Sequence, residues 1–252
     1  MLKTKLASGQ TVIGGWISSG NTAVAEIFAK AGYDWVAVDL EHSAINISQV
    51  AELIRVIDLA GSAPLVRLTA NDSNQIKRVL DAGAHGIIVP MVNTCEEARA
   101  AVKATRYPPA GARGVGLSRA QGYGSMFDQY KEWQSNGITV VVQIENVKAV
   151  KQLEGIFCVE GVDAYMVGPY DLSNSLGIPG QFENKQFTSL LEKINNIGIE
   201  MNCTAGIQVV EPNEEQLKMA INEGYRFIAY SVDFRMLDAT ARNGLKSIGR
   251  NK

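Results

Sequence analysis

Short apolar runs rich in β-branched residues alternate along the chain with longer segments in which apolar residues recur at helical spacing. In segment 47–59, Val50, Leu53, Ile54 and Ile57 fall on one face of a helix. Residues 138–144 instead form a continuous apolar run, which is typical of a parallel strand buried on both faces. The alternation predicts eight strands, at 12–17, 34–39, 63–68, 86–92, 138–144, 162–167, 199–204 and 225–230.

Helices are expected between nearly all of these strands, and their ends carry capping signals. Asn71 or Asp72 is a plausible N-cap of a helix that runs to residue 82, and Thr94 with Glu97 forms a capping box. Residues 107–124 are rich in glycine and proline and predict a loop. The remaining helices are expected at 21–31, 47–59, 126–136, 147–157, 186–197 and 213–222, with a final helix after the last strand.

Eight strand–helix units in 252 residues predict a (β/α)8 TIM barrel that forms a single domain over residues 1–252. A Gly ends the helix before several strands, as at Gly32, Gly83, Gly161 and Gly224, which is C-cap chemistry used at repeated turns. A doubly wound sheet is the alternative, but no GxGxxG motif follows the first strand.

Composition narrows the class of partner. The net charge is −2, so the chain has no electrostatic footprint for nucleic acid or for an anionic membrane. No apolar run reaches the roughly 18 residues of a membrane span, and no signal peptide is evident. The three widely spaced cysteines, Cys95, Cys158 and Cys203, favour reduced thiols. We therefore expect a cytoplasmic protein.

In a barrel the polar residues that finish each strand converge at one end, where TIM-barrel enzymes carry their active sites. Here they include a histidine, an arginine, a glutamine and several carboxylates. They are Trp16 and Ser18, Asp39 to His42, Arg67, Pro90, Gln143 and Glu145, Gly168 to Asp171, Cys203 and Thr204, and Ser231 with Asp233.

Glu145 and Asp171 follow neighbouring strands, and two carboxylates with open positions suit a hard divalent cation such as Mg²⁺ or Mn²⁺. The alternative for Glu145 is that it caps the following helix. His42 is a candidate general base beside acidic residues, although a histidine in a loop is often structural. Arg67 ends a buried strand, so it must meet a carboxylate of the protein or of a substrate.

Two other classes of enzyme fit less well. The glycine-rich run 111–116 is not a P-loop, because no GK[ST] follows it. The loops after the last two predicted strands lack the glycine-rich pattern of a barrel phosphate site, which argues against a sugar-phosphate isomerase. No lysine ends a predicted strand, which argues against a Schiff-base aldolase.

The chain resembles the HpcH/HpaI family of class II, metal-dependent pyruvate aldolases, and more distantly the citrate lyase β-subunit and malyl-CoA lyases. Order and spacing agree over residues 8–240. The matching phrases are VDLEHS at 38–43, LDAG at 80–83, VPMV at 89–92, ATRYPP at 104–109, RGVG at 113–116, VQIE at 142–145 and VGPYDLS at 167–173.

The resemblance implies a role for each matching residue. It makes His42 the proton acceptor, Asp81 the acid that raises the basicity of His42, and Arg67 the group that stabilises the enolate. Glu145 and Asp171 match the ligands of a divalent cation, Mg²⁺ or Mn²⁺ with Co²⁺ as a further option. The expected substrate contacts are Trp16, Gln143, Gly168, Tyr170 and Asp171.

The resemblance also implies an activity. The enzyme would cleave a 4-hydroxy-2-oxo acid into pyruvate and an aldehyde, or form the acid from them. The family forms hexamers, so a homo-oligomer is expected, and the final helix either docks on a neighbour or covers its own barrel. Leu40 and Tyr170 depart from the family pattern, and the bulky Tyr170 should reshape the aldehyde pocket. The alternatives are a CoA-thioester lyase and a non-catalytic barrel.

Overall fold

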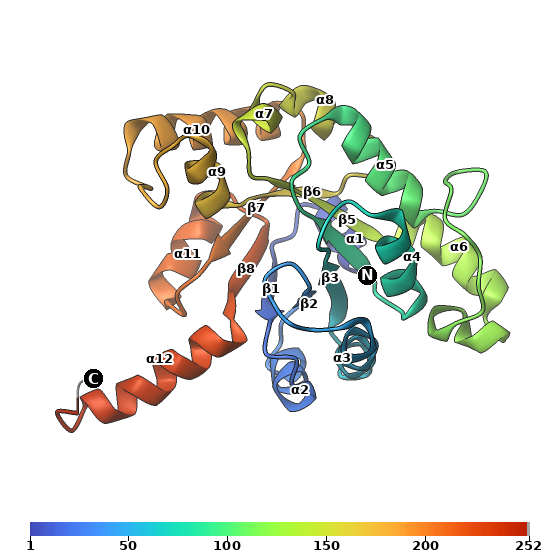
Figure 1. The fold of residues 1–252 in the computed structure, drawn as a ribbon, viewed down its shortest axis with the longest axis horizontal. Helices are drawn as coiled ribbons and strands as arrows, with labels where there is room; N and C mark the ends of the chain where they lie inside the picture. The colour runs from blue at the N-terminus through green and yellow to red at the C-terminus, as the bar shows by residue number, and fades with distance from the viewer. Residues whose placement is uncertain (251–252) are drawn as a thin grey trace.

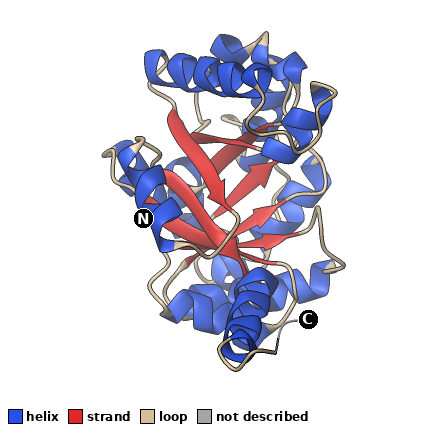
Figure 2. Cartoon of the chain, turned by 90° about the vertical axis from the view of Figure 1, so that its left-hand side faces the viewer, coloured by secondary structure: helices blue, strands red, loops and turns tan. Residues whose placement is uncertain are grey.

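The computed structural model describes residues 1–250, and its strands close into a parallel barrel in the order β1 to β8. The helices surround this barrel on the outside (Figures 1 and 2). The predicted (β/α)8 fold is confirmed. The strands are β1 (Val12–Ile17), β2 (Trp35–Asp39), β3 (Ala63–Arg67), β4 (Gly86–Val89), β5 (Thr139–Ile144), β6 (Ala164–Val167), β7 (Thr204–Val209) and β8 (Phe227–Val232).

The helices follow the strands with few exceptions, and several predicted caps are present. Asp72 rather than Asn71 caps α4, and Thr94 and Glu97 form the expected capping box. The helices are α1 (Leu2–Ala7), α2 (Thr22–Lys30), α3 (Ile47–Leu59), α4 (Ser73–Asp81), α5 (Cys95–Thr105), η1 (Arg119–Gly124), α6 (Phe127–Gly137), α7 (Val147–Val150), α8 (Leu153–Phe157), α9 (Pro169–Ser175), α10 (Lys185–Glu200), α11 (Glu214–Asn222) and α12 (Asp233–Lys246).

The prediction for the seventh strand was wrong. Residues 199–204 were expected to be a strand, but α10 continues to Glu200, and Asn202 then takes a left-handed backbone conformation with φ 52°. The strand begins only at Thr204 and ends at Val209. Smaller differences are the division of segment 147–157 into α7 and α8, and the short helix η1 inside the expected loop.

Large aromatic side chains fill the barrel interior. The Trp35 and Phe227 rings stack with centroids 4.3 Å apart, and Trp16 meets Trp35 edge to face. Helix α1 covers the amino-terminal end of the barrel, where its Leu2 and Leu6 are buried in the same cluster. The polar end of the barrel therefore lies opposite α1, at the carboxyl ends of the strands.

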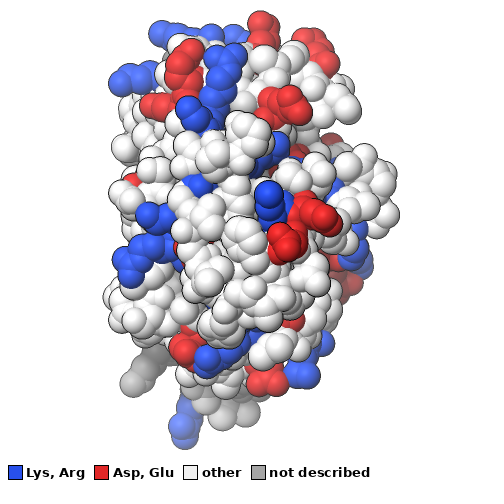
Figure 3. Space-filling view, turned by 90° about the vertical axis from the view of Figure 1, so that its right-hand side faces the viewer, with Lys and Arg blue, Asp and Glu red and all other residues white. Residues whose placement is uncertain are grey.

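The outer surface carries mixed charge. Basic and acidic side chains are interspersed on the face shown in Figure 3, in keeping with the net charge of −2. None of the helices in residues 1–250 combines the length and apolar character that a membrane span needs. Helix α12 extends away from the barrel (Figure 1).

Candidate active site

Asp39 organises the polar end of the barrel. It is the last residue of β2 and is buried, and its two carboxylate oxygens accept hydrogen bonds from Nε and a terminal nitrogen of Arg67 at 2.8 and 2.7 Å. In β2 and β3 these two residues are direct neighbours in register, which explains why their side chains meet. The expectation that Arg67 meets a carboxylate is confirmed.

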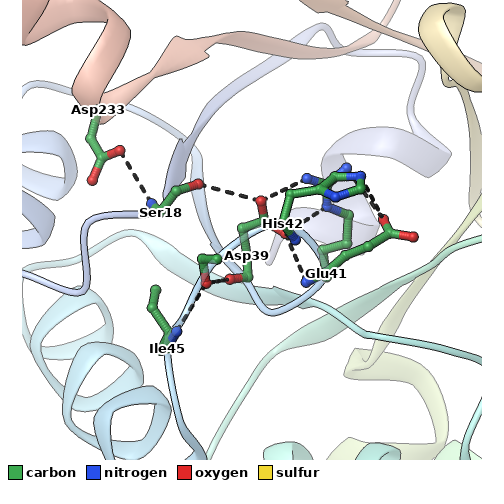
Figure 4. A network of polar contacts seen from close by, with 8 residues as sticks. Ser18, Asp39, Glu41, His42, Ile45 and Asp233 are labelled. Carbon is green, nitrogen blue, oxygen red and sulfur yellow. Dashed lines mark hydrogen bonds and ion pairs between the residues drawn. The ribbon is translucent and has the colours of Figure 1, made fainter.

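The same carboxylate fixes the loop that carries His42. The backbone amides of Glu41 and His42 donate to Asp39 at 3.0 and 3.3 Å, and the Ser18 hydroxyl donates to it at 3.3 Å (Figure 4). Burial acts to raise the pKa of Asp39, but Arg67 and the two amides outweigh burial and hold the pKa below its ordinary value. Asp39 therefore stays ionised and holds both Arg67 and the His42 loop in place.

A second anchor joins the last strand to the first. Asp233, the first residue of α12, accepts hydrogen bonds from the backbone amides of Ser18 and Ser19 at 3.2 and 3.0 Å. Since Ser18 also contacts Asp39, the loop after β1 is bound on both sides (Figure 4). Hydrogen bonds thus connect the loops after β1 and β2 to the start of α12 around Asp39.

A cavity of about 250 Å³ opens beside Arg67. Most of the residues that the sequence predicts for the site meet here, although they come from different strands. The polar residues that line the cavity are His42, Arg67, Gln143, Glu145, Tyr170, Asp171, Gln208 and Arg235, and Gly168 lines it as well.

Glu145 sits deep in this cavity and is 3% exposed. Burial, and after it the charges of Glu41 and Asp171, raise its pKa to about 8, while Arg67 and a backbone hydrogen bond from Met91 oppose the rise. Met91 holds a left-handed conformation with φ 53°. Such strain in a non-glycine residue persists only where the surroundings enforce it.

Gly168 makes room for Glu145. A Cβ atom built on Gly168 would lie 2.6 Å from Cγ of Glu145, closer than real contacts allow. Pro169 then begins α9, and the turn brings Asp171 into the first turn of this helix. Glycine is therefore required at position 168, because a side chain there would displace the side chain of Glu145.

Further groups at the site have unmet hydrogen-bonding capacity. Oε1 of Gln143 is buried without a hydrogen-bond partner, and Oε2 of Glu41 is buried without a hydrogen bond, although it lies 3.5 Å from a terminal nitrogen of Arg67. Burial raises the pKa of Glu41. Trp16 lies beneath Arg67, with the guanidinium carbon 4.6 Å from the centre of its ring. Buried acceptors of this kind call for a ligand that donates to them or carries positive charge.

The crowding of Glu41, Glu145 and Asp171 fits a hard cation. The charges of Glu41 and Asp171 both act on Glu145, and the charge of Asp171 also acts on Glu41. Within residues 1–250 the side chains are not arranged as a ready cluster of three metal ligands. The donor chemistry nevertheless suits a divalent ion with oxygen ligands, with positions left for substrate and water.

Asp81 lies elsewhere. It ends α4 and so stands at the amino-terminal end of the barrel, opposite His42, where its carboxylate pairs with Arg113 at 2.6 Å. Within one chain the expected contact between Asp81 and His42 is not made. The carboxylate beside His42 is Glu41, with 3.9 Å between Nε2 and Oε2.

Several site residues were missed by the sequence analysis. Gln208 and Val210 went unnoticed because the seventh strand was placed too early, and Phe234 and Arg235 because they follow the expected end of the last strand. Met91 lies in the matching phrase VPMV, but its left-handed backbone conformation gives no signal in the sequence. The Gln208 side chain would have been found from the alternation of Ile207 and Val209 around it.

Comparison with known proteins agrees with this architecture. The HpcH/HpaI aldolase/citrate lyase family model matches residues 12–239. The chain is 38% identical over 241 residues to a 4-hydroxy-2-oxo-heptane-1,7-dioate aldolase of Escherichia coli, covering 95% of this chain and 91% of that protein. It is 35% identical over 244 residues to a hydroxypyruvate/pyruvate aldolase of Roseobacter denitrificans, covering 96% and 94% of the two chains.

A solved structure is similar over nearly its whole length. An HpcH/HpaI aldolase/citrate lyase family protein from Burkholderia cenocepacia superposes with a TM-score of 0.93 at 33% identity, covering 99% of each chain. The family is one of divalent-metal-dependent carbon–carbon lyases. By sequence and by fold, the chain belongs to the HpcH/HpaI aldolase/citrate lyase family.

Proposed function

We propose that this chain is a metal-dependent pyruvate aldolase, which cleaves a 4-hydroxy-2-oxo acid into pyruvate and an aldehyde or runs the reverse addition. The observation that carries the proposal is the cavity in which Arg67 and His42 face Glu145 and Asp171. The two relatives described above are both named as aldolases, which supports the same reaction class.

In the cleavage direction, the bond between C3 and C4 of the substrate breaks. Its electron pair becomes part of the pyruvate enolate, the C4 hydroxyl loses its proton as the aldehyde forms, and C3 later takes up a proton. The enzyme must therefore hold negative charge on the oxo-acid side and remove one proton on the aldehyde side.

Arg67 supplies fixed positive charge for the first task. Its Nε and one terminal nitrogen are engaged by Asp39, while its other terminal nitrogen lies 3.5 Å from Glu41 and faces the cavity. A guanidinium that is held in this way needs little reorganisation when the enolate charge develops. Gln143, buried beside it, is placed to orient the oxo acid.

His42 is assigned the second task. It lines the cavity with a side chain that is 62% exposed, so it lies toward the mouth, where C4 of a bound substrate would be. A neutral imidazole nitrogen can accept the proton of a hydroxyl group. Glu41 beside it would stabilise the protonated ring.

Glu145 and Asp171 would hold the divalent ion, which we expect to be Mg²⁺ or Mn²⁺, with Co²⁺ as a substitute. Bound there, the ion would supply Lewis-acid polarisation of the 2-oxo group. Gly168 lines the cavity and is proposed as a further substrate contact. Trp16 is buried beneath Arg67 and is not among the residues that line the cavity, so its proposed role is to support the guanidinium.

The test is metal-dependent exchange of the pyruvate methyl protons in D₂O, followed by NMR, together with release of pyruvate from 4-hydroxy-2-oxo acids. We expect both with Mg²⁺ or Mn²⁺, and neither with chelator or in Glu145→Gln. His42→Ala should slow cleavage while leaving metal affinity largely intact. Turnover that survives both chelation and Glu145→Gln would overturn the metal assignment.

Two properties of the whole molecule belong to the same proposal. The three cysteines are unpaired, which supports a reducing compartment such as the cytoplasm. Leu237 and Leu245 on the projecting helix α12 are exposed, which supports a homo-oligomer. Light scattering coupled to size exclusion tests the second, since a monomer would contradict it.

A further inference from the structure

Two large aromatic side chains are exposed at the mouth of an otherwise polar cavity. Tyr170, in the first turn of α9, is 61% exposed, and Phe234, in the first turn of α12, is 55% exposed. Both line the cavity that contains Arg67 and Glu145. Exposed apolar side chains that converge on a binding site mark a contact for an apolar ligand group.

The Tyr170 ring is held in position from outside the cavity. It meets Phe182 edge to face, with ring centroids 5.0 Å apart, and Phe182 in turn packs against the buried Phe187 at 5.5 Å. Phe182 itself does not line the cavity. This chain of rings connects Tyr170 to the core, so Tyr170 presents a fixed apolar surface rather than a mobile side chain.

The depth of the cavity decides which part of a substrate meets these rings. Gln143 and Glu145 are each 3% exposed and lie at the bottom, where the oxo acid would sit. The portion of the substrate beyond C4 then points outward, toward Tyr170 and Phe234. That portion derives from the aldehyde, so the two rings contact the aldehyde's substituent.

Charge at the mouth does not favour an anionic aldehyde. Arg67 is assigned to the oxo acid at the bottom of the cavity. The other arginine among the described residues that line the cavity, Arg235, is bound to Glu211, with Nε and Oε1 2.9 Å apart, and also to Asp238. A carboxylate on the aldehyde would have to compete with these protein carboxylates.

We propose that Tyr170 and Phe234 form an aromatic clamp that selects neutral aldehydes bearing a flat apolar group, with Phe182 as a positioning residue behind Tyr170. This inference rests on the proposed aldolase function and names its acceptor class.

The experiment compares the addition of pyruvate to benzaldehyde, acetaldehyde and glyoxylate, as kcat/KM for the aldehyde in the metal-loaded enzyme. Benzaldehyde should exceed both of the others at least tenfold. In Tyr170→Ala the ratio of benzaldehyde to acetaldehyde should fall about five- to tenfold, which corresponds to the loss of one aromatic contact. Phe182→Leu should lower the same ratio by a smaller factor, mainly through KM for benzaldehyde.

Tyr123→Ala is the matched control, because Tyr123 is another exposed aromatic and lies on η1, away from the cavity. It should leave the ratio unchanged. A preference for glyoxylate, or a ratio that Tyr170→Ala does not move, would overturn the clamp while methyl exchange of pyruvate still upheld the aldolase function. Absence of both exchange and cleavage would overturn the function and the clamp together.

Discussion

Arg67 and Asp39 form a bidentate ion pair across two neighbouring strands, in which Asp39 also receives two backbone amides of the His42 loop. One carboxylate thereby positions the proposed enolate-stabilising cation and the proposed base together. A substitution of Asp39 should therefore displace both Arg67 and the loop that carries His42.

Replacing Arg67 by lysine should distinguish the contribution of the positive charge from that of the bidentate hydrogen bonds to Asp39. Lysine keeps the positive charge but cannot form the two parallel hydrogen bonds to Asp39. We expect kcat/KM for cleavage to fall about 100-fold or more, as for the loss of a preorganised oxyanion donor. Steady-state kinetics with circular dichroism checks this, since a folded Arg67→Lys enzyme with wild-type kinetics would contradict it.

Asp39→Ala should be costly for stability as well as for activity. It leaves the nearly buried Arg67 guanidinium without its bidentate partner, and breaking a buried pair costs about 3–5 kcal/mol. The free energy of unfolding from urea titration measures the effect. Arg55→Ala is the matched control, because Arg55 pairs with Glu52 on the exposed surface of α3 and should contribute under about 1 kcal/mol.

The raised pKa of Glu145 predicts a pH-dependent stability of the metal-free enzyme. The folded-state pKa is about 8, above the ordinary value of 4.5 that applies when the chain is unfolded. The stabilising contribution of this proton is therefore fully present below pH 4.5 and is lost as the pH rises through 8. In EDTA, Tm should decline between pH 5.5 and 8.5.

Glu145→Gln is the control for that titration, because it keeps the shape and removes the ionisation. Its Tm should depend less on pH over the same interval. Added Mg²⁺ should raise the Tm of the wild type more at pH 8.5 than at pH 6, because metal binds the ionised carboxylate. Equal slopes in both proteins would show that another group titrates.

Gly168→Ala should weaken metal binding. The added Cβ would displace Cγ of Glu145, and misplacing a ligand in this way typically lowers metal affinity 10- to 100-fold. Gly244→Ala on α12 is the control, since its Cβ would meet nothing within 4 Å. Isothermal titration with Mn²⁺ distinguishes the two, and equal affinities would refute the packing argument.

Asp81 has two separable roles to test. Its pairing with the buried Arg113 predicts a structural contribution, so Asp81→Asn should lower the free energy of unfolding by about 1–3 kcal/mol. The family resemblance predicts a contribution to proton transfer instead. A pH–rate profile measured well below the Tm tells them apart, because a purely structural role would leave the profile unmoved.

Local signals in the sequence were sufficient for most of the fold. The helix 47–59 was predicted with its observed bounds because its apolar face is regular, and the structure adds a capping box formed by Asn46 and Gln49. The seventh strand was misplaced because Ile197, Ile199 and Met201 recur at every second residue, which is the spacing of a strand. In the structure the helix continues to Glu200, and Asn202 rather than a glycine takes the left-handed conformation after it. Tertiary closure of the barrel, not local propensity, decides that boundary.

For the site, residues that end strands were predictable, and residues fixed by long-range packing were not. Arg67, Gln143 and Glu145 follow from where apolar runs stop. Met91 contacts Glu145 through its backbone in a left-handed conformation, and Arg235 reaches the cavity through the path of the chain after β8. Such placements depend on contacts between distant segments, which no local pattern encodes.

The closed amino-terminal end of the barrel determines how molecules enter and leave the cavity. The stacked Trp35 and Phe227 and the covering helix α1 block the amino-terminal end, so molecules enter and leave the cavity only past the rim where Tyr170 lies. In the proposed cleavage, with the oxo acid at the bottom and the aldehyde above it, we expect the aldehyde to depart first. The enolate would then remain beneath the rim until C3 is protonated, and pyruvate would be the last product to leave.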